Sequence, residues 1–171
     1  MNIRSERGNS VVEVAIFLPV LMMLLVGMYQ IAQVTYTWYT LRKAVYAVAT
    51  YLSTEQGVNF CNNPGDPGIT AAINFGITGT TDASQPVVVA GLTPDMVVVT
   101  PESYDPVAQA ATAYDTSLCG ANDTIASPDF ITVSIPNSIT TGFTVQPVIP
   151  FFSTIQPFSL SPQVQVPYGG T

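Results

Sequence analysis

The sequence predicts an α+β protein: a long N-terminal helix, first transmembrane and then a stalk, followed by a small, β-rich domain that contains a disulfide. Two observations carry this prediction. Val14–Ala32 is apolar and uncharged, and after Gly57 the composition changes to proline, glycine, threonine and asparagine with short β-like runs. We therefore divide the chain into a cytoplasmic leader at 1–8, a transmembrane and stalk helix at 9–56, and an extracytoplasmic domain at 57–171.

The apolar run is long enough to cross a membrane. At about 1.5 Å per helical residue, Val14–Ala32 reaches roughly 28 Å, close to the thickness of a bilayer's hydrocarbon core. A cleaved signal peptide is the alternative, but signal cores have only about 7–15 apolar residues, and the nearest Ala-x-Ala sequence is distant, at Ala47–Ala49. Pro19 lies inside the run and predicts a modest kink, because it removes one backbone hydrogen bond.

The helix is expected to continue beyond the membrane to about Ser53, since helix-forming residues persist to that point. Its start is predicted at Ser10, because Ser10–Glu13 has the pattern of a capping box. Apolar residues in its second half recur at helical spacing and predict a stripe that packs on the domain or on a neighbouring subunit: Leu41, Ala44, Val45, Val48 and Leu52. Aromatic residues near the end of the span predict an interfacial belt: Tyr29, Tyr36, Trp38 and Tyr39.

Short runs after Gly57 predict the strands of the domain: Ile73–Ile77, Pro86–Ala90, Met96–Thr100, Ile131–Ile135, Phe143–Ile149 and Gln163–Val166. Ile131–Ile135 and Gln163–Val166 alternate between apolar and polar residues, as strands with one buried face do. Ala108–Ala113 is expected to form a short helical turn. Frequent prolines in the last third of the chain favour edge strands.

Charge is distributed very unevenly. The four basic residues, Arg4, Arg7, Arg42 and Lys43, precede Ala44, and the nine acids that follow it have no basic partner. Such a domain cannot neutralise phosphates, so nucleic acid is excluded as a partner, and the helix has to provide the membrane anchor. Basic residues are equally frequent on both sides of the span, so the positive-inside rule gives no orientation. The absence of basic residues from the domain and its cysteines favour the outer side.

Cys61 and Cys119 are the two cysteines of the chain, and both lie in the domain. A disulfide between them would close a loop of about 59 residues and stabilise the fold by roughly 4 kcal/mol in the chain-entropy model. The alternative is a pair of unpaired thiols in a cytosolic domain. Structural pairing is favoured over redox catalysis because there is no Cys-x-x-Cys motif.

The sequence contains no recognisable catalytic, metal-binding or phosphate-binding motif. The chain has no histidine, which removes the usual general base and a common metal ligand. Acids at 105, 115, 123 and 129 lack the spacing of a calcium loop, and no glycine-rich sequence resembles a phosphate-binding loop. We therefore expect no enzyme, no catalytic residue, no metal, no cofactor and no small-molecule substrate.

The run from Gly8 to Gly27 resembles the start of the TadE-like pseudopilins, minor pilin-like proteins of the bacterial tight-adherence (Tad) pilus, a subclass of type IV pili. Gly8, Glu13 and Pro19 have the spacing of the family pattern, and an apolar run and an alanine-containing helical extension follow them. Ala90–Val99 and Ile131–Pro136 also resemble the outer domain of the family.

The resemblance implies that a prepilin peptidase at the cytoplasmic face cuts between Gly8 and Asn9. It also implies that Glu13 neutralises the terminal amine of a neighbouring subunit and sets the register of assembly, which would relieve the cost of a carboxylate at the edge of hydrocarbon. Asn9 is not aromatic and Val14 replaces the tyrosine of the major Tad pilins. The residues themselves leave two alternatives open, a linker role for Gly8 and a purely helix-capping role for Glu13.

The function that the resemblance implies is that of a minor pilin-like component of a Tad-type pilus or secretion assembly, with roles in pilus biogenesis and surface attachment. The protein would span the bacterial inner membrane once, with its C-terminal domain outside the cytoplasm or incorporated in a pilus. Its partners would be inner-membrane lipid, other pilin or pseudopilin subunits and a prepilin peptidase. Two alternatives are a structural subunit of an extracellular filament and a membrane-tethered adhesin.

Overall fold

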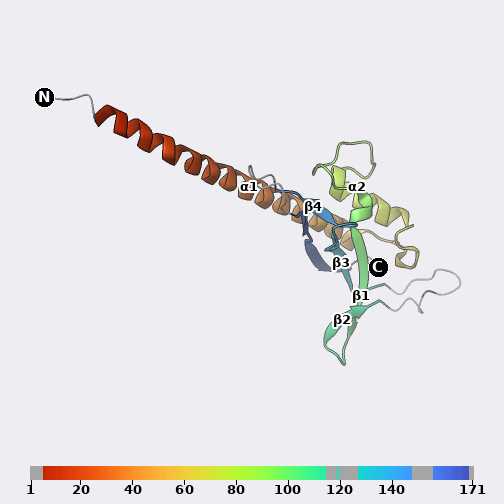
Figure 1. The fold of residues 1–171 in the computed structure, drawn as a ribbon. Coiled ribbons are helices and arrows are strands. Elements are labelled where there is room, and N and C mark those ends of the chain that lie inside the picture. The colour runs from red at the N-terminus through yellow and green to blue at the C-terminus, as the bar shows by residue number, and fades with distance from the viewer. Residues whose placement is uncertain (1–5, 115–118, 120–126, 148–155, 170–171) are drawn as a thin grey trace.

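A computed structural model describes residues 6–114, 119, 127–147 and 156–169, with side chains from Val11 onward. Helix α1 (Glu6–Thr54) is 49 residues long, which corresponds to about 74 Å. Its N-terminal half projects away from the other elements, and its C-terminal half packs among them (Figure 1). We call the described residues after Thr54 the head.

The observed ends of α1 correct one sequence prediction. The helix begins at Glu6, so Ser10 lies inside it and the predicted cap at Ser10 is wrong. Glu6 and Arg7 are good helix formers, and one glycine costs only about 1 kcal/mol, so the helix extends for another turn. Its C-terminal end at Thr54 agrees with the predicted end near Ser53. Pro19 lies inside α1, which continues through it.

The head contains one further α-helix, α2 (Pro67–Thr78), and two short 3₁₀ helices, η1 (Phe60–Asn62) and η2 (Pro94–Met96). Its strands are β1 (Val98–Asp105), β2 (Ala110–Ala113), β3 (Phe130–Ser134), β4 (Phe143–Val145), β5 (Phe158–Leu160) and β6 (Gln163–Pro167). These strands form an antiparallel sheet in the order β2-β1-β3-β6 and a separate antiparallel pair, β4–β5. The α+β prediction is therefore confirmed.

Two of the predicted strands, at 131–135 and 163–166, coincide with β3 and β6. The pattern in β6 is as expected, because Val164 and Val166 are half-buried between exposed neighbours. Strand β3 differs, since Ile131, Thr132 and Val133 are all buried. It lies in the centre of the sheet, between β1 and β6, and both of its faces are covered.

The other predicted strands fit less well. The run at 96–100 is shifted, because β1 begins at Val98, and the run at 143–149 is shortened to β4, with 148 and 149 outside the described residues. The run at 86–90 forms no strand. The predicted helical turn at 108–113 is wrong as well, because β2 pairs with β1 there, with Asp105 opposite Ala110. The alanines of β2 follow this pairing with β1 rather than their own helical preference.

The predicted strand at 73–77 is wrong because the residues lie in α2, whose two ends are well specified. The Asp66 carboxylate accepts hydrogen bonds from the backbone N–H groups of Gly68 and Ile69, and Pro67 occupies the first helical turn. Gly79 ends the helix in the left-handed conformation, with φ of 81°. These start and stop signals outweigh the β-branched composition of the segment.

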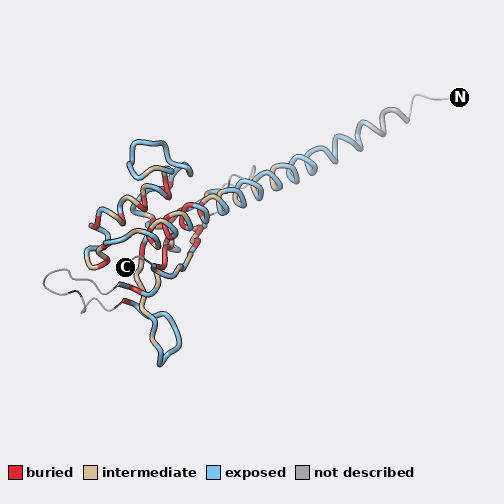
Figure 2. The backbone as a smooth tube through the Cα atoms, turned by 180° about the vertical axis from the view of Figure 1, so that it is seen from behind, coloured by how far each residue is buried: buried red, intermediate tan, exposed pale blue. Residues whose placement is uncertain are grey.

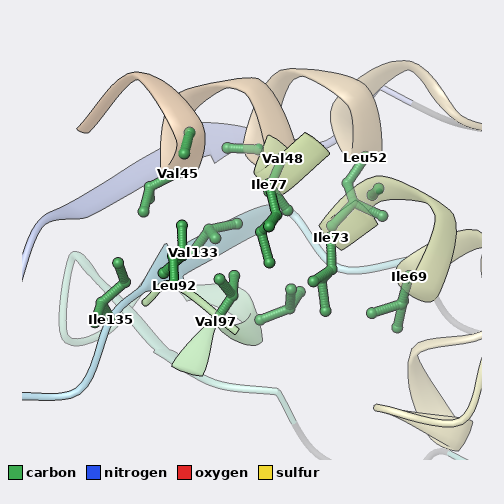
Figure 3. Close-up of a cluster of buried hydrophobic side chains, with 14 of the residues drawn as sticks. Val45, Val48, Leu52, Ile69, Ile73, Ile77, Leu92, Val97, Val133 and Ile135 are labelled. Carbon is green, nitrogen blue, oxygen red and sulfur yellow. The ribbon is translucent and has the colours of Figure 1, made fainter. Parts of the chain in front are cut away.

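The predicted stripe on α1 forms the centre of the core. Its five members, Leu41, Ala44, Val45, Val48 and Leu52, are all buried. They belong to one core cluster with residues of α2, of β3 and of the segments next to these elements, including Ile69, Ile77, Leu92, Val133 and Ile135 (Figure 3). Figure 2 shows that burial is concentrated where α1 passes through the head. Of the two partners left open by the sequence, the stripe therefore packs on its own domain.

The two residues after β6 bind the C-terminal end of α1 and the residue that follows it. The Tyr168 hydroxyl donates a hydrogen bond to the carbonyl oxygen of Glu55 at 3.0 Å, and the Gly169 N–H donates one to the carbonyl oxygen of Ser53 at 3.1 Å. The ring of Tyr168 also meets Phe60 edge-on, with 5.2 Å between centroids. These contacts join two segments that are far apart in sequence.

Replacing Tyr168 with phenylalanine is expected to lower the free energy of unfolding by about 1 kcal/mol at neutral pH, because one hydrogen bond is lost. Burial, then Glu55 and Asp66, raise the pKa of Tyr168. The neutral phenol is thus favoured in the folded state, and its contribution to stability is lost as pH rises above its ordinary pKa, about 10. Urea unfolding of both full-length proteins in detergent should show the wild-type advantage shrinking above that pH. A constant advantage up to pH 11 would contradict this assignment.

Candidate membrane-spanning and assembly surface

The N-terminal half of α1 presents apolar side chains on every face. The large hydrophobic residues between Val11 and Leu25 are at least half exposed, from 50% at Leu18 to 69% at Val11. A core helix of a soluble protein would be buried, whereas the most apolar window of this helix has no buried residue. A helix that is apolar all round is stable within a bilayer or among other helices. By length and composition, α1 fits the anchor of a single-pass membrane protein.

Glu13 lies at the start of this apolar surface. Its side chain is exposed beside Val14, Phe17 and Leu21 on one face of α1. None of the side chains that the structure describes forms an ion pair with it. Gly8 and Asn9 precede it in the first two turns of α1, and Asn9 lies about one helical turn before Glu13. The three residues proposed for processing and register therefore share one short helical segment.

The residues of the predicted aromatic belt lie on the stretch of α1 beside the head. Tyr29, Tyr36 and Tyr39 are 62%, 73% and 62% exposed, and Trp38 is 38% exposed. The ammonium group of Lys43 lies 5.8 Å from the centre of the Tyr39 ring. An amphipathic ring near a cation is the arrangement that the boundary between hydrocarbon and lipid headgroups favours.

The predicted pairing of Cys61 and Cys119 is confirmed, with 5.8 Å between their Cα atoms and 58 residues between them in sequence. Cys61 belongs to η1, directly after α1, and Cys119 lies between β2 and β3. The bond therefore joins the segment that follows α1 to the connection between β2 and β3. Where the structure describes the chain, no three acidic, cysteine or histidine side chains come together as a metal site.

Three acids near the ends of β1 and β3 have structural partners instead. The Asp105 carboxylate accepts hydrogen bonds from the N–H groups of Val107 and Ala108 in the β1–β2 turn. Asp129 accepts one from the Tyr104 N–H, and Glu102 accepts one from the side chain of Gln165. The acids at 115 and 123 lie outside the described residues.

Sequence reasoning missed a set of half-buried residues in the N-terminal part of the contact between α1 and the head: Val26, Gln30, Val34 and Thr37. They continue the buried stripe at helical spacing toward the N-terminus. Their helical spacing is present in the sequence. It did not predict a contact with the head, because two of the four residues are polar and the four lie in or near the segment expected to face lipid. Only the position of the β4–β5 pair reveals that the head reaches this level.

Together these features define a class of protein: a head domain carried on a helix that fits a single membrane span. Residues 8–50 match the family model described as TadE-like protein, which confirms the resemblance seen in the sequence. The match covers α1 from Gly8 through Glu13 and Pro19 to the stalk, and supports a Tad pilus-associated, minor pilin-like role. The role of that family is structural rather than enzymatic. No curated protein and no solved structure matches the chain.

Proposed function

We propose that this protein is a minor pilin-like component of a Tad-type pilus or secretion assembly that acts in pilus biogenesis and surface attachment. The observation that carries the proposal is the exposed apolar surface of the N-terminal half of α1, from Val11 to Leu25, within the TadE-like segment. This surface holds the protein in lipid and can exchange lipid for the helices of other pilus subunits. The head then remains at the surface of the membrane or of the filament.

In this proposal residues 1–8 are a cytoplasmic leader, 9–56 cross the inner membrane and form the stalk, and 57–171 lie outside the cytoplasm. Two features support this orientation. The bond between Cys61 and Cys119 persists in an oxidising compartment, whereas the bacterial cytosol keeps thiols reduced. The domain after the stalk also contains no lysine or arginine, the residues that favour the cytoplasmic side.

The assembly step depends on Glu13. Cleavage by a prepilin peptidase between Gly8 and Asn9 would leave a cationic amine on Asn9, about one turn before Glu13. A carboxylate at the edge of hydrocarbon is costly by itself, and an amine from a neighbouring subunit would offset this cost. Because the pair forms only at one axial offset between helices, it would also fix their register.

Replacing Glu13 with glutamine tests this step, since the change removes the charge and preserves the size. Removing one partner of a buried charge pair costs about 3–5 kcal/mol, so the variant should co-purify with other pilus subunits at less than a tenth of the wild-type level. It should still enter the membrane fraction. The readout is quantitative mass spectrometry of the subunits captured with the tagged protein from detergent-solubilised membranes.

Asp95→Asn is the matched control, because it also neutralises one exposed acid, but in the head. It should capture the subunits as the wild type does. The intact masses of all three proteins should lack residues 1–8, which separates an assembly defect from a processing defect. Full capture by the processed Glu13→Gln variant would exclude a role for the charge and leave Glu13 as a residue of the helix start.

A further inference from the structure

One face of α1 is covered well beyond the core of the head. The half-buried residues Val26, Gln30, Val34 and Thr37 lie on this face. At the same level Met28, which lies on another face, is 69% exposed. The head therefore lies beside α1 as far as Val26.

The element opposite this face is the β4–β5 pair. It and α1 enclose a groove of about 1050 Å³, with Val26 to Thr37 on one side and Val145, Pro147 and Phe158 on the other. Val145 and Val34 both pack against the core, which fixes the pair beside the helix (Figure 1). Phe158 remains 40% exposed at the groove. The lining is mostly apolar.

The groove lies at the depth of one leaflet of the bilayer. A hydrocarbon core of about 30 Å that begins at Val14 ends near Val34. It cannot begin much earlier, because Glu6, Arg7 and Glu13 lie at the N-terminal end of α1. Val26 is thus about 12 Å inside the head-side boundary, and the β4–β5 pair lies against the part of α1 between Val26 and this boundary.

The charges of the surrounding surface suit this position. No side chain from Phe130 to the C-terminus is charged, so the β4–β5 pair can enter a lipid surface without burying a charge. Arg42 and Lys43 are exposed on α1 one to two turns beyond Tyr36 and Tyr39, where they can contact lipid phosphates. Tyr29 and Tyr36 lie within the groove, and the basic pair follows farther along the helix, in the order of acyl chains and phosphates in a leaflet.

We propose that the β4–β5 pair is a second membrane contact, and that acyl chains of the head-side leaflet fill the groove between this pair and α1. The head would then rest on the membrane at a fixed height and rotation, instead of standing on a bare stalk. Lipid is favoured over a second copy of the chain because one side of the groove is the spanning helix itself. The inference depends on membrane insertion of α1 and not on the pilus role.

Tryptophan fluorescence in brominated lipids tests the inference. The chain has one tryptophan, so a Trp38→Phe background allows a single reporter to be placed at Phe158. The full-length protein is reconstituted in phosphatidylcholine–phosphatidylglycerol vesicles with bromines on the acyl chains. Phe158→Trp should lose at least half of its emission relative to unbrominated vesicles and be protected from aqueous iodide. Gln146→Trp, at an exposed residue of the same groove, gives an independent reading.

Two reference positions define the outcomes. Phe17→Trp reports the span and should be quenched by bromine, and Val107→Trp, 92% exposed at the β1–β2 turn, should not be. If both groove reporters behave like Val107→Trp while Phe17→Trp is quenched, the second contact is wrong and the span remains. If Phe17→Trp is not quenched either, the membrane anchor fails too. Protection from iodide without bromine quenching, growing with the protein-to-lipid ratio, would assign the groove to another copy of the chain and overturn the proposal.

Discussion

Replacing Gly76 with valine is expected to lower the free energy of unfolding of the head by about 3 kcal/mol, at the upper end of the cost of overpacking a core. Gly76 is a buried residue of α2 at its contact with α1. A Cβ atom at this position would lie 2.3 Å from Cγ2 of Val48 and 2.8 Å from the carbonyl oxygen of Ala44. The second neighbour is backbone, so rotation of a side chain cannot relieve the clash.

The consequence is a separation of the two helices. Val48 and Ile77 face each other across this contact (Figure 3), and both are almost fully buried. Moving α2 outward would open space around them, and the lost contacts add to the steric cost. The gain in helix propensity on replacing glycine is a few tenths of a kcal/mol for valine, too small to compensate.

Gly27→Val is the matched control, since Gly27 lies inside α1 and a Cβ there meets no atom within 4 Å. Urea unfolding of full-length wild type and both variants in detergent, followed by near-ultraviolet circular dichroism, measures the difference. The Gly27 variant should unfold within about 0.5 kcal/mol of the wild type. Equal midpoints for the Gly76 variant and the wild type would mean that α1 and α2 do not pack as closely as described.

The helical half of the fold was largely predictable because its signals are local. The stripe from Leu41 to Leu52 repeats with the helical period, and all five of its members are buried. The apolar run could be interpreted without any knowledge of the head. The start of α1 was missed because a capping pattern at Ser10 is compatible with a helix that begins one turn earlier.

The strands were harder to predict because their signals depend on distant partners. Strand β3 was recognised from its alternation, but its two buried faces follow from its central position between β1 and β6. Strand β2 has the composition of a helix and is extended only because it pairs with β1. Conversely, Ile73–Ile77 has the composition of a strand but is helical, because Asp66 and Gly79 cap the two ends of α2.

In the candidate assembly surface, too, the features with local sequence signals were predicted and those that depend on distant segments were not. Glu13 was singled out from the family resemblance, the apolar residues after it from their composition, and the disulfide from the presence of two cysteines. The groove beside Val26 was not predicted, because it is formed by the β4–β5 pair, more than a hundred residues later in the chain. A contact of this kind has no signature in either segment, and only the folded head brings them together.

Removing the disulfide by the double substitution Cys61→Ser/Cys119→Ser is expected to lower the free energy of unfolding by about 4 kcal/mol, the largest effect we anticipate. The bond spans 58 residues, so its loss frees a long loop in the unfolded chain and stabilises that state. Both sulfur atoms belong to half-buried residues. Serine is close in size to cysteine and leaves little empty space in the folded head.

Because either substitution removes the same bond, the losses of unfolding free energy caused by the two single substitutions should not add. Each single substitution should cost nearly as much as the double one, and the reduced wild type should unfold at the denaturant concentration of the double variant. Denaturant unfolding in detergent, with free thiols counted by mass after alkylation, measures both quantities. Two single effects that sum to the double effect would show that Cys61 and Cys119 stabilise the head through separate packing contacts. The bond would then contribute little, and the disulfide would no longer support placing the head outside the cytoplasm.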